Sequence, residues 1–252
     1  MSTAASAIAH IASIPPQAYA HAMPSGRWSE IAKGTASMSL NGEAASPAQV
    51  VAALGTPVSF SRNSEIFGDD QLAEHVYVVT TGVVRICKLM GDGRRQIETF
   101  CLPGDAFGWE TGDRYRFSAE AVSECRLVRV KRSVLFSRAG AEPELACALW
   151  ALSFAELQRA QEHLLLLGRK TAQERVGSFL LDLARRAGTT TASNVTELQL
   201  AMSRQDMADF LGLTIETVSR TLTCLEEQGT ISLPSSRRVQ LRDRSALRRL
   251  DS

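Results

Sequence analysis

The spacing of hydrophobic and polar positions changes along the chain, and each change marks a different kind of element. Residues 1–45 are rich in Ala, Ser, Gly and Pro, with few periodic apolar positions, so a flexible N-terminal tail is expected there. A short helix is predicted next, with Ser46 as its N-cap, Pro47 in its first turn and Gln49 reaching back to the cap. This helix should end near Gly55.

Residues 58–130 consist of short apolar and β-branched runs that are broken by turn residues. The runs at 75–79 and 126–130 are typical of strands, and Gly93 stands where a hairpin tip needs a positive φ. Several short strands at near-regular spacing favour a sandwich or barrel. We therefore expect residues 46–140 to form one β domain.

After Pro143 the apolar spacing becomes helical, and residues 141–168 are expected to form one long helix. One stripe of this helix repeats at intervals of three and four, through Trp150, Ser153, Leu157, Ala160, Leu164 and Leu167. Such a seam is typical of helices that pair lengthwise. A helix lying on its own domain would show a similar stripe, but polar residues beside the seam favour a dimer interface.

The segment from Ser203 to Leu222 has the pattern of a helix-turn-helix. Ser203 is the predicted N-cap of a first short helix, Gly212 allows a tight turn, and Thr214 is the predicted N-cap of a second helix. Two short helices joined by a three-residue, glycine-containing turn are the hallmark of this motif. Residues 169–252 are therefore expected to form a DNA-binding domain.

The outer face of the second helix carries side chains that can read base edges. Arg220 can donate two hydrogen bonds to guanine, Glu216 can accept one from cytosine, Ser219 suits several bases, and Ile215 can contact a thymine methyl group. A Glu and an Arg four residues apart are also an ordinary surface pair on a helix. The caps, turn glycine and core spacing together favour DNA reading.

Contacts to the DNA backbone are expected from both ends of the domain. Residues 231–241 read as a β-hairpin wing, which a short helix at 245–250 follows. The expected phosphate-contacting residues are Ser203, Arg204, Thr214, Thr217, Arg237 and Arg238. The alternative is that the two wing arginines are merely exposed.

Composition narrows the class of protein only slightly. The net charge is +1, and the C-terminal part from Arg169 has thirteen Lys and Arg against ten Asp and Glu, a difference of +3. Five scattered cysteines suit free thiols in a reducing cytosol. No run of about 18 apolar residues occurs, and the N-terminus lacks the pattern of a signal peptide, so we expect a cytoplasmic protein without a membrane partner.

The order of β-roll, long seam helix and winged helix resembles the CRP/FNR superfamily of transcription regulators. The resemblance covers roughly residues 50–250, and it is most specific at 207–220, which closely matches the family's recognition motif. Residues 77–86 and 103–108 resemble parts of its cyclic-nucleotide-binding-like roll. It implies an α+β fold, a homodimer, double-stranded DNA as partner and contact with RNA polymerase.

The base-reading residues of the second helix are similar to those of FNR rather than to those of CRP. They include Glu216, Ser219 and Arg220, whereas Ile215 stands where the CRP type has an arginine. The resemblance implies half-sites like TTGAT in an inverted repeat, which a twofold dimer reads with its two subunits.

The roll carries no evident cofactor site. Phe117 takes the place of the arginine that grips a cyclic phosphate, and Arg116 is one residue away, which in a strand is the opposite face. Residues 1–86 contain no cysteine for an iron–sulfur cluster, and His75 is the one histidine in the roll available to haem. No HxH pair or nucleophile–base pair suggests an enzyme.

These features resemble the FixK-type branch, whose members read DNA like FNR and have no evident cofactor. The resemblance implies a regulator that mainly activates genes needed when oxygen is limiting. An alternative is a regulator gated by a small molecule in the roll, with Glu110, Arg114 and Arg116 as lining. Cys224 near the recognition face is a candidate redox site, because oxidation to an acid would repel DNA; a simple space-filling role is the competing interpretation.

Overall fold

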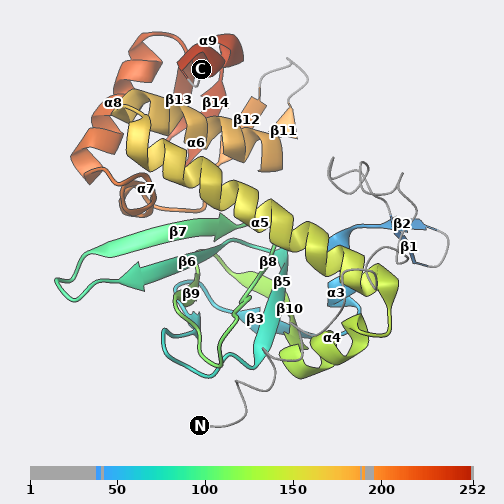
Figure 1. Cartoon of the computed structure of the whole chain (residues 1–252). Coiled ribbons are helices and arrows are strands. Elements are labelled where there is room, and N and C mark those ends of the chain that lie inside the picture. Colours follow the sequence, from blue (N-terminus) through green and yellow to red (C-terminus); the bar gives the residue numbers. More distant parts are fainter. Residues whose placement is uncertain (1–37, 41–42, 188, 191–195, 251–252) are drawn as a thin grey trace.

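A long helix divides the molecule into two parts. The structure is a computed structural model that describes residues 38–40, 43–187, 189–190 and 196–250 of the 252-residue chain. Helix α5 (Pro143–Arg169) crosses the centre, with a β-roll on one side and a mainly helical C-terminal domain on the other (Figure 1). The α+β class and the order of roll, long helix and winged helix-turn-helix are confirmed.

The roll consists of two four-stranded antiparallel sheets. One has the order β3 (Thr56–Phe60), β10 (Cys125–Lys131), β5 (His75–Thr81) and β8 (Ala106–Phe107). The other has the order β4 (Glu65–Phe67), β9 (Ser118–Ala121), β6 (Val84–Leu89) and β7 (Arg95–Cys101). Alternate residues point between the sheets, and this interior includes Phe67, Tyr77 and Phe107.

The β6–β7 hairpin extends beyond the roll. The amide of Met90 donates to the carbonyl of Arg94, and that of Gly93 donates back to Met90. Gly93 has a φ of 86°, as the pattern predicted for this turn. In Figure 1 the hairpin projects below helix α7 (Arg204–Leu211), which packs on β7.

Short elements flank the roll on its N-terminal side and beside α5. Helix α3 (Pro47–Ala52) begins with the predicted capping box of Ser46 and Gln49. Strands β1 (Met38–Leu40) and β2 (Glu43–Ala45) pair before it, so regular structure begins earlier than the expected end of the tail at residue 45. The remainder of that predicted tail lies outside the described residues. Helix α4 (Arg132–Ala139) connects β10 to α5.

The C-terminal domain packs the helices of a winged helix-turn-helix against a small sheet. It contains α6 (Ala172–Ala187), α7, α8 (Ile215–Glu227) and α9 (Arg244–Leu250). Its sheet has the order β11 (Thr189–Thr190), β12 (Thr196–Gln199), β14 (Arg238–Leu241) and β13 (Ile231–Ser235). Strands β13 and β14 form the predicted wing, and α9 confirms the expected last helix.

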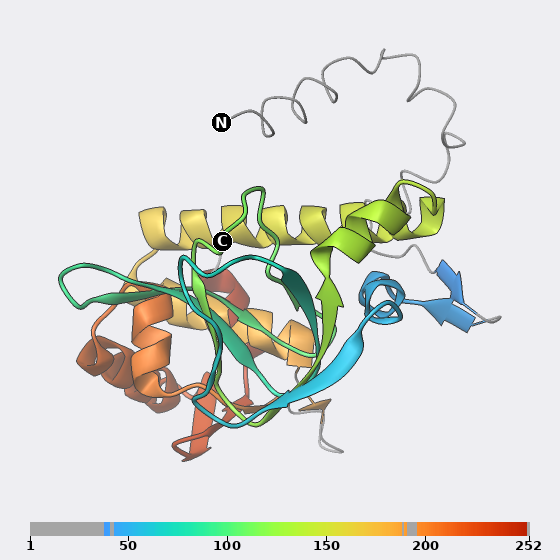
Figure 2. The ribbon, with the colours of Figure 1, turned by 90° about the horizontal axis from the view of Figure 1, so that it is seen from below.

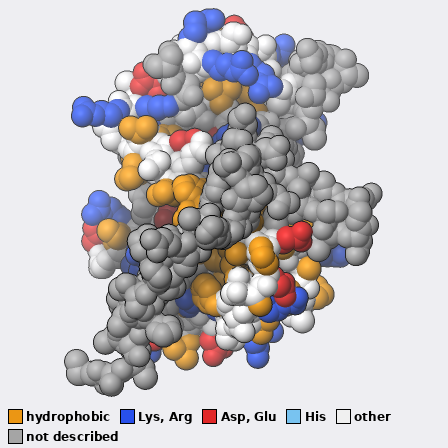
Figure 3. Space-filling model, turned by 45° about the vertical axis from the view of Figure 1, so that its right-hand side comes forward, with side chains coloured by type: hydrophobic (Ala, Val, Ile, Leu, Met, Phe, Trp, Pro, Cys, Tyr) orange, Lys and Arg blue, Asp and Glu red, His pale blue; other side chains and the backbone are white. Residues whose placement is uncertain are grey.

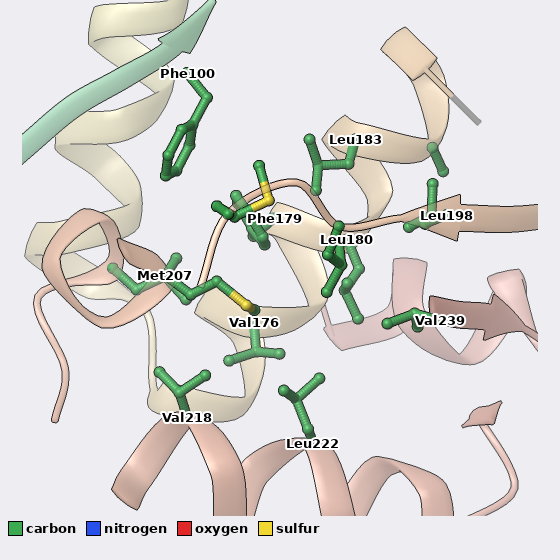
Figure 4. Close-up of a cluster of buried hydrophobic side chains, with 14 of the residues drawn as sticks. Phe100, Val176, Phe179, Leu180, Leu183, Leu198, Met207, Val218, Leu222 and Val239 are labelled. Carbon is green, nitrogen blue, oxygen red and sulfur yellow. The ribbon is translucent and has the colours of Figure 1, made fainter. Parts of the chain in front are cut away.

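One apolar cluster joins the two parts. Phe100 on β7 points toward the side chains of the C-terminal domain (Figure 4) and lies with Phe179 and Met207 in one buried cluster. Its ring centroid lies 5.4 Å from that of Phe210 on α7 and 6.1 Å from that of Phe179 on α6. The roll is therefore packed directly against the helix-turn-helix.

Candidate nucleic-acid interface

The two helices of the motif are capped and spaced as the sequence predicts. The Asp206 amide donates to Ser203 Oγ at 3.0 Å, and the Ser203 amide donates to Asp206 Oδ2 at 3.0 Å, which starts α7. Gly212 ends α7 in the left-handed region with a φ of 61°, and Thr214 then caps α8 by accepting from the Thr217 amide at 3.2 Å. Glycine takes this conformation at the lowest steric cost, because it has no Cβ.

Helix α8 buries one stripe and exposes the opposite face. Val218, Leu222 and Leu225 are fully buried against the domain. The four predicted base-reading side chains are all exposed, namely Ile215, Glu216, Ser219 and Arg220. Because they occur at the first, second, fifth and sixth positions of α8, they share one face at its N-terminal end. This is the end that enters the major groove in helix-turn-helix proteins.

The carboxylate of Glu216 is ionised and ready to accept hydrogen bonds. Its pKa is lowered by hydrogen bonding to its own backbone amide and to the Thr214 hydroxyl group, with a smaller contribution from Arg220. An ionised carboxylate accepts from cytosine N4, whereas the Arg220 guanidinium donates to guanine. Donor and acceptor therefore stand side by side on one helix face.

The predicted phosphate-contacting residues occupy helix starts and the wing. Ser203 and Thr214 are N-caps, and Thr217 lies beside Thr214, with their hydroxyl oxygens 3.1 Å apart. Arg204 is half-buried, with Nη1 3.3 Å from Met207 Sδ. Figure 3 shows several Lys and Arg side chains at the upper end of one face, where the C-terminal domain lies.

The two wing arginines are held by the domain itself. Arg238 forms an ion pair with Glu197 on β12, and Arg237 donates through Nη1 to the Ala201 carbonyl at 2.7 Å. The pKa of Glu197 is lowered by its hydrogen bonds from Arg238 and Gln240. The guanidinium groups of Arg237 and Arg238 therefore both bond to groups of their own domain. Contact of either arginine with a DNA phosphate remains a prediction.

The seam of α5 lies open along most of its length. Trp150, Leu157 and Leu164 are between 51% and 71% exposed, and Ser153 and Ala160 are exposed as well. Phe154 and Leu165 add apolar surface that the heptad pattern did not include. In Figure 2 the helix runs along one side of the molecule. A stripe of several exposed apolar side chains along one helix is typical of an interface.

Leu167 does not continue this open stripe. It is half-buried and packs against the C-terminal domain next to Gly212. The reason is that the chain turns back after Arg169, so that α6 and the helix-turn-helix cover the last turn of α5. That Leu167 lies in the dimer interface with the other seam residues stays a prediction.

Each of the charged residues proposed as effector lining in the roll has an ion-pair partner within the roll. Arg116 Nε donates to Glu110 Oε2 at 3.0 Å, and Arg114 lies 3.5 Å from an Asp70 carboxylate oxygen. Arg116 is exposed, whereas Phe117 is half-buried against the roll interior; both precede strand β9, which begins at Ser118. These pairs leave the small-molecule alternative as a prediction.

The cysteines, all of which lie in the described ranges, are free thiols. Cys87, Cys101 and Cys125 are buried, and Cys224 on α8 is half-buried, with its Sγ 3.2 Å from Gln228 Nε2. The redox role of Cys224 remains a prediction. Among the described residues there is no cluster of His, Cys, Asp and Glu side chains suited to a metal, and no helix is long and apolar enough to cross a membrane.

Both halves of the chain match known domain families. Residues 174–250 match the Crp-like helix-turn-helix domain, and residues 57–138 match the cyclic nucleotide-binding domain. The chain is 85% identical, over the full length of both proteins, to the nitrogen fixation regulation protein FixK of Azorhizobium caulinodans. It belongs to the CRP/FNR family.

Other members of this family are similar over most of the chain. The FixK protein of Rhizobium meliloti is 43% identical over 192 residues, which are 76% of this chain and 85% of that protein. The solved structure of FixK2 from Bradyrhizobium japonicum has a TM-score of 0.73 and 47% identity, and covers 79% of this chain and 98% of that one. The chain is thus a FixK-type transcription regulator with a DNA-binding helix-turn-helix, not an enzyme.

Proposed function

We propose that this CRP/FNR family member binds, as a homodimer, an inverted repeat with half-sites like TTGAT. The observation that carries the proposal is the exposed face of α8, where Glu216, Ser219 and Arg220 stand together at the helix start. Two such faces related by a twofold axis read two half-sites of opposite orientation. The open stripe of α5 supplies the surface for that axis.

We further propose that the protein acts in the cytoplasm, mainly as an activator of genes for oxygen limitation, and that it contacts RNA polymerase. The support is its similarity to FixK proteins and to relatives whose names describe activators, such as the transcriptional activatory protein AadR of Rhodopseudomonas palustris, at 40% identity over 71% of this chain.

The proposal is tested by selecting bound sequences from random double-stranded DNA with the purified protein. We expect an inverted repeat with TTGAT-like halves in the absence of any added ligand. Arg220→Ala removes one bidentate base contact from each half-site, and each contact is worth about 1–3 kcal/mol, so the affinity of the dimer for that repeat should fall by about 30-fold or more. Its affinity for scrambled duplex should stay unchanged within about threefold, because backbone contacts remain.

The matched control is Arg62→Ala, which removes the same charge from an exposed position in the roll. It should leave both affinities as they are. The proposal fails if the selection yields no inverted repeat. It also fails if Arg220→Ala and Arg62→Ala have equal effects on the selected site.

A further inference from the structure

Charged side chains join the β6–β7 hairpin of the roll to the first helix of the helix-turn-helix. Arg95 donates through Nε to Asp209 Oδ2 at 2.7 Å and through Nη2 to Asp206 Oδ1 at 2.6 Å. Arg85 donates through Nη1 to the same oxygen of Asp206 at 3.0 Å. The paired residues are 111 to 121 positions apart in the chain, so these contacts connect the two parts of the molecule.

The four side chains are sheltered from solvent. Asp206 is 6% exposed, Arg85 and Asp209 are 12% exposed, and Arg95 is 24% exposed. An ion pair on an open surface contributes little, whereas removal of one partner from a buried pair leaves an uncompensated charge. Burial alone would raise the pKa of Asp206, but hydrogen bonds from Ser203 and the charges of Arg85 and Arg95 outweigh it and lower that pKa.

A groove lies between the two domains beside these ion pairs. This groove, of about 830 Å³, lies between the hairpin tip and the turn that leads into α8, with Met90 and Arg94 on one wall and Thr214 and Thr217 on the other. Arg95 and Asp209 also line this groove. The ion pairs therefore stand at its inner edge, where they oppose any rocking of the helix-turn-helix away from the hairpin.

The orientation of the helix-turn-helix matters because two copies must engage one duplex. Helix-turn-helix dimers bind half-sites about 34–36 Å apart, and one base pair more or less rotates the second half-site by about 35°, since 10–10.5 base pairs make one turn. A helix-turn-helix that is held firmly on the roll cannot follow this rotation of the second half-site. A helix-turn-helix that is held loosely can follow the displaced half-site. It binds more weakly at the preferred spacing, because fixing its orientation on the DNA costs entropy.

We propose that Arg85 and Arg95 are positioning residues, which through Asp206 and Asp209 fix the helix-turn-helix on the roll and so set the half-site spacing that the dimer accepts. The roll thereby takes part in the choice of DNA site without touching a base. This inference rests on the proposed function, because it requires a dimer on an inverted repeat.

The test measures the affinity of the full-length protein for three duplexes, which carry the selected inverted repeat at its preferred spacing, one base pair longer and one base pair shorter. Arg95→Gln removes the ion pairs of Arg95 with both Asp206 and Asp209, whereas Asp209→Asn removes only the second of them, and the two substitutions change the net charge in opposite directions. Arg94→Gln is the matched control, because Arg94 is 80% exposed and pairs with Asp92 in the same hairpin turn.

We expect the wild type and Arg94→Gln to lose affinity steeply, by about tenfold or more, when the spacing changes. For Arg95→Gln the three affinities should differ by less than about threefold, with the loss of affinity concentrated at the preferred spacing. Asp209→Asn should reduce the spacing dependence in the same direction but to a smaller extent, because Asp206 still pairs with both arginines. A purely electrostatic effect on DNA binding would move these two variants in opposite directions and leave the spacing dependence intact.

The inference is overturned if both variants fold, as judged by thermal unfolding, and keep the steep spacing dependence of the wild type. If Arg95→Gln does not fold, Asp209→Asn alone decides, since that residue has no part in the capping box of α7. If the wild type itself shows no preference for an inverted repeat, the proposed function has failed, which is a different result.

Discussion

At the scale of single residues, His163 links α5 to the helix-turn-helix. Its ring stacks on Phe210 with centroids 4.2 Å apart, and its Nε2 donates to the Phe210 carbonyl at 2.8 Å. Burial lowers the pKa of His163 from its ordinary value of 6.5, and the hydrogen bond to Phe210 only partly opposes this. The neutral imidazole is therefore the form that the folded interface prefers.

A dependence of stability on pH follows from this preference. Below its ordinary pKa, His163 takes up a proton more readily in the unfolded chain than in the folded one, so the free energy of unfolding falls as pH drops from about 7.5 to 5.5. His163→Gln should flatten this slope in denaturant titrations. His75, whose pKa is also lowered by burial, contributes equally in both proteins. Identical slopes would contradict the prediction.

At the scale of elements, the open stripe of α5 predicts dimerisation. Leu157 and Leu164 are 52% and 71% exposed, one heptad apart on the same face. The double substitution Leu157→Glu and Leu164→Glu should place charges in the interface and convert the dimer into a monomer. Light scattering should then give the mass of one 27.4 kDa chain instead of about twice that mass.

The control for this change is Ala155→Glu, which adds a charge to an exposed position of α5 outside the seam. It should remain dimeric. A wild-type protein that is monomeric at micromolar concentration, or a double variant that stays dimeric, would contradict the assignment of this face.

Elements that depend on neighbouring residues could be predicted from the sequence, and those that depend on distant residues could not. The caps at Ser203 and Thr214 and the turn at Gly212 lie within a few positions of what they stabilise, so the pattern located both helices. Leu167 satisfied the heptad spacing, but the return of α6 covers it. No local signal connects Arg85 with Asp206, because 121 positions separate them.

At the scale of the whole molecule, the roll and the C-terminal domain share a buried cluster. Phe100 is 2% exposed and packs against Phe179 and Phe210 of the other domain. Phe100→Ala should cost about 3–5 kcal/mol and reduce protection from hydrogen exchange in α6 and α7, although the residue belongs to the roll. Mass spectrometry of peptides from these helices measures the effect.

Phe107→Ala provides the comparison, since Phe107 is equally buried but packs within the roll against Phe67 and Tyr77. Its effect on exchange should stay in the roll. Unchanged protection of α7 in Phe100→Ala would show that the two domains open independently.

Asp206 performs two tasks at once. It closes the capping box that begins α7, and it receives the guanidinium groups of Arg85 and Arg95 from the roll. Fraying of the first turn of α7 would therefore take one carboxylate partner from each arginine, and withdrawal of the hairpin would weaken that same turn. We therefore expect the order of the first turn of α7 and the contact between the two domains to be coupled through this one carboxylate.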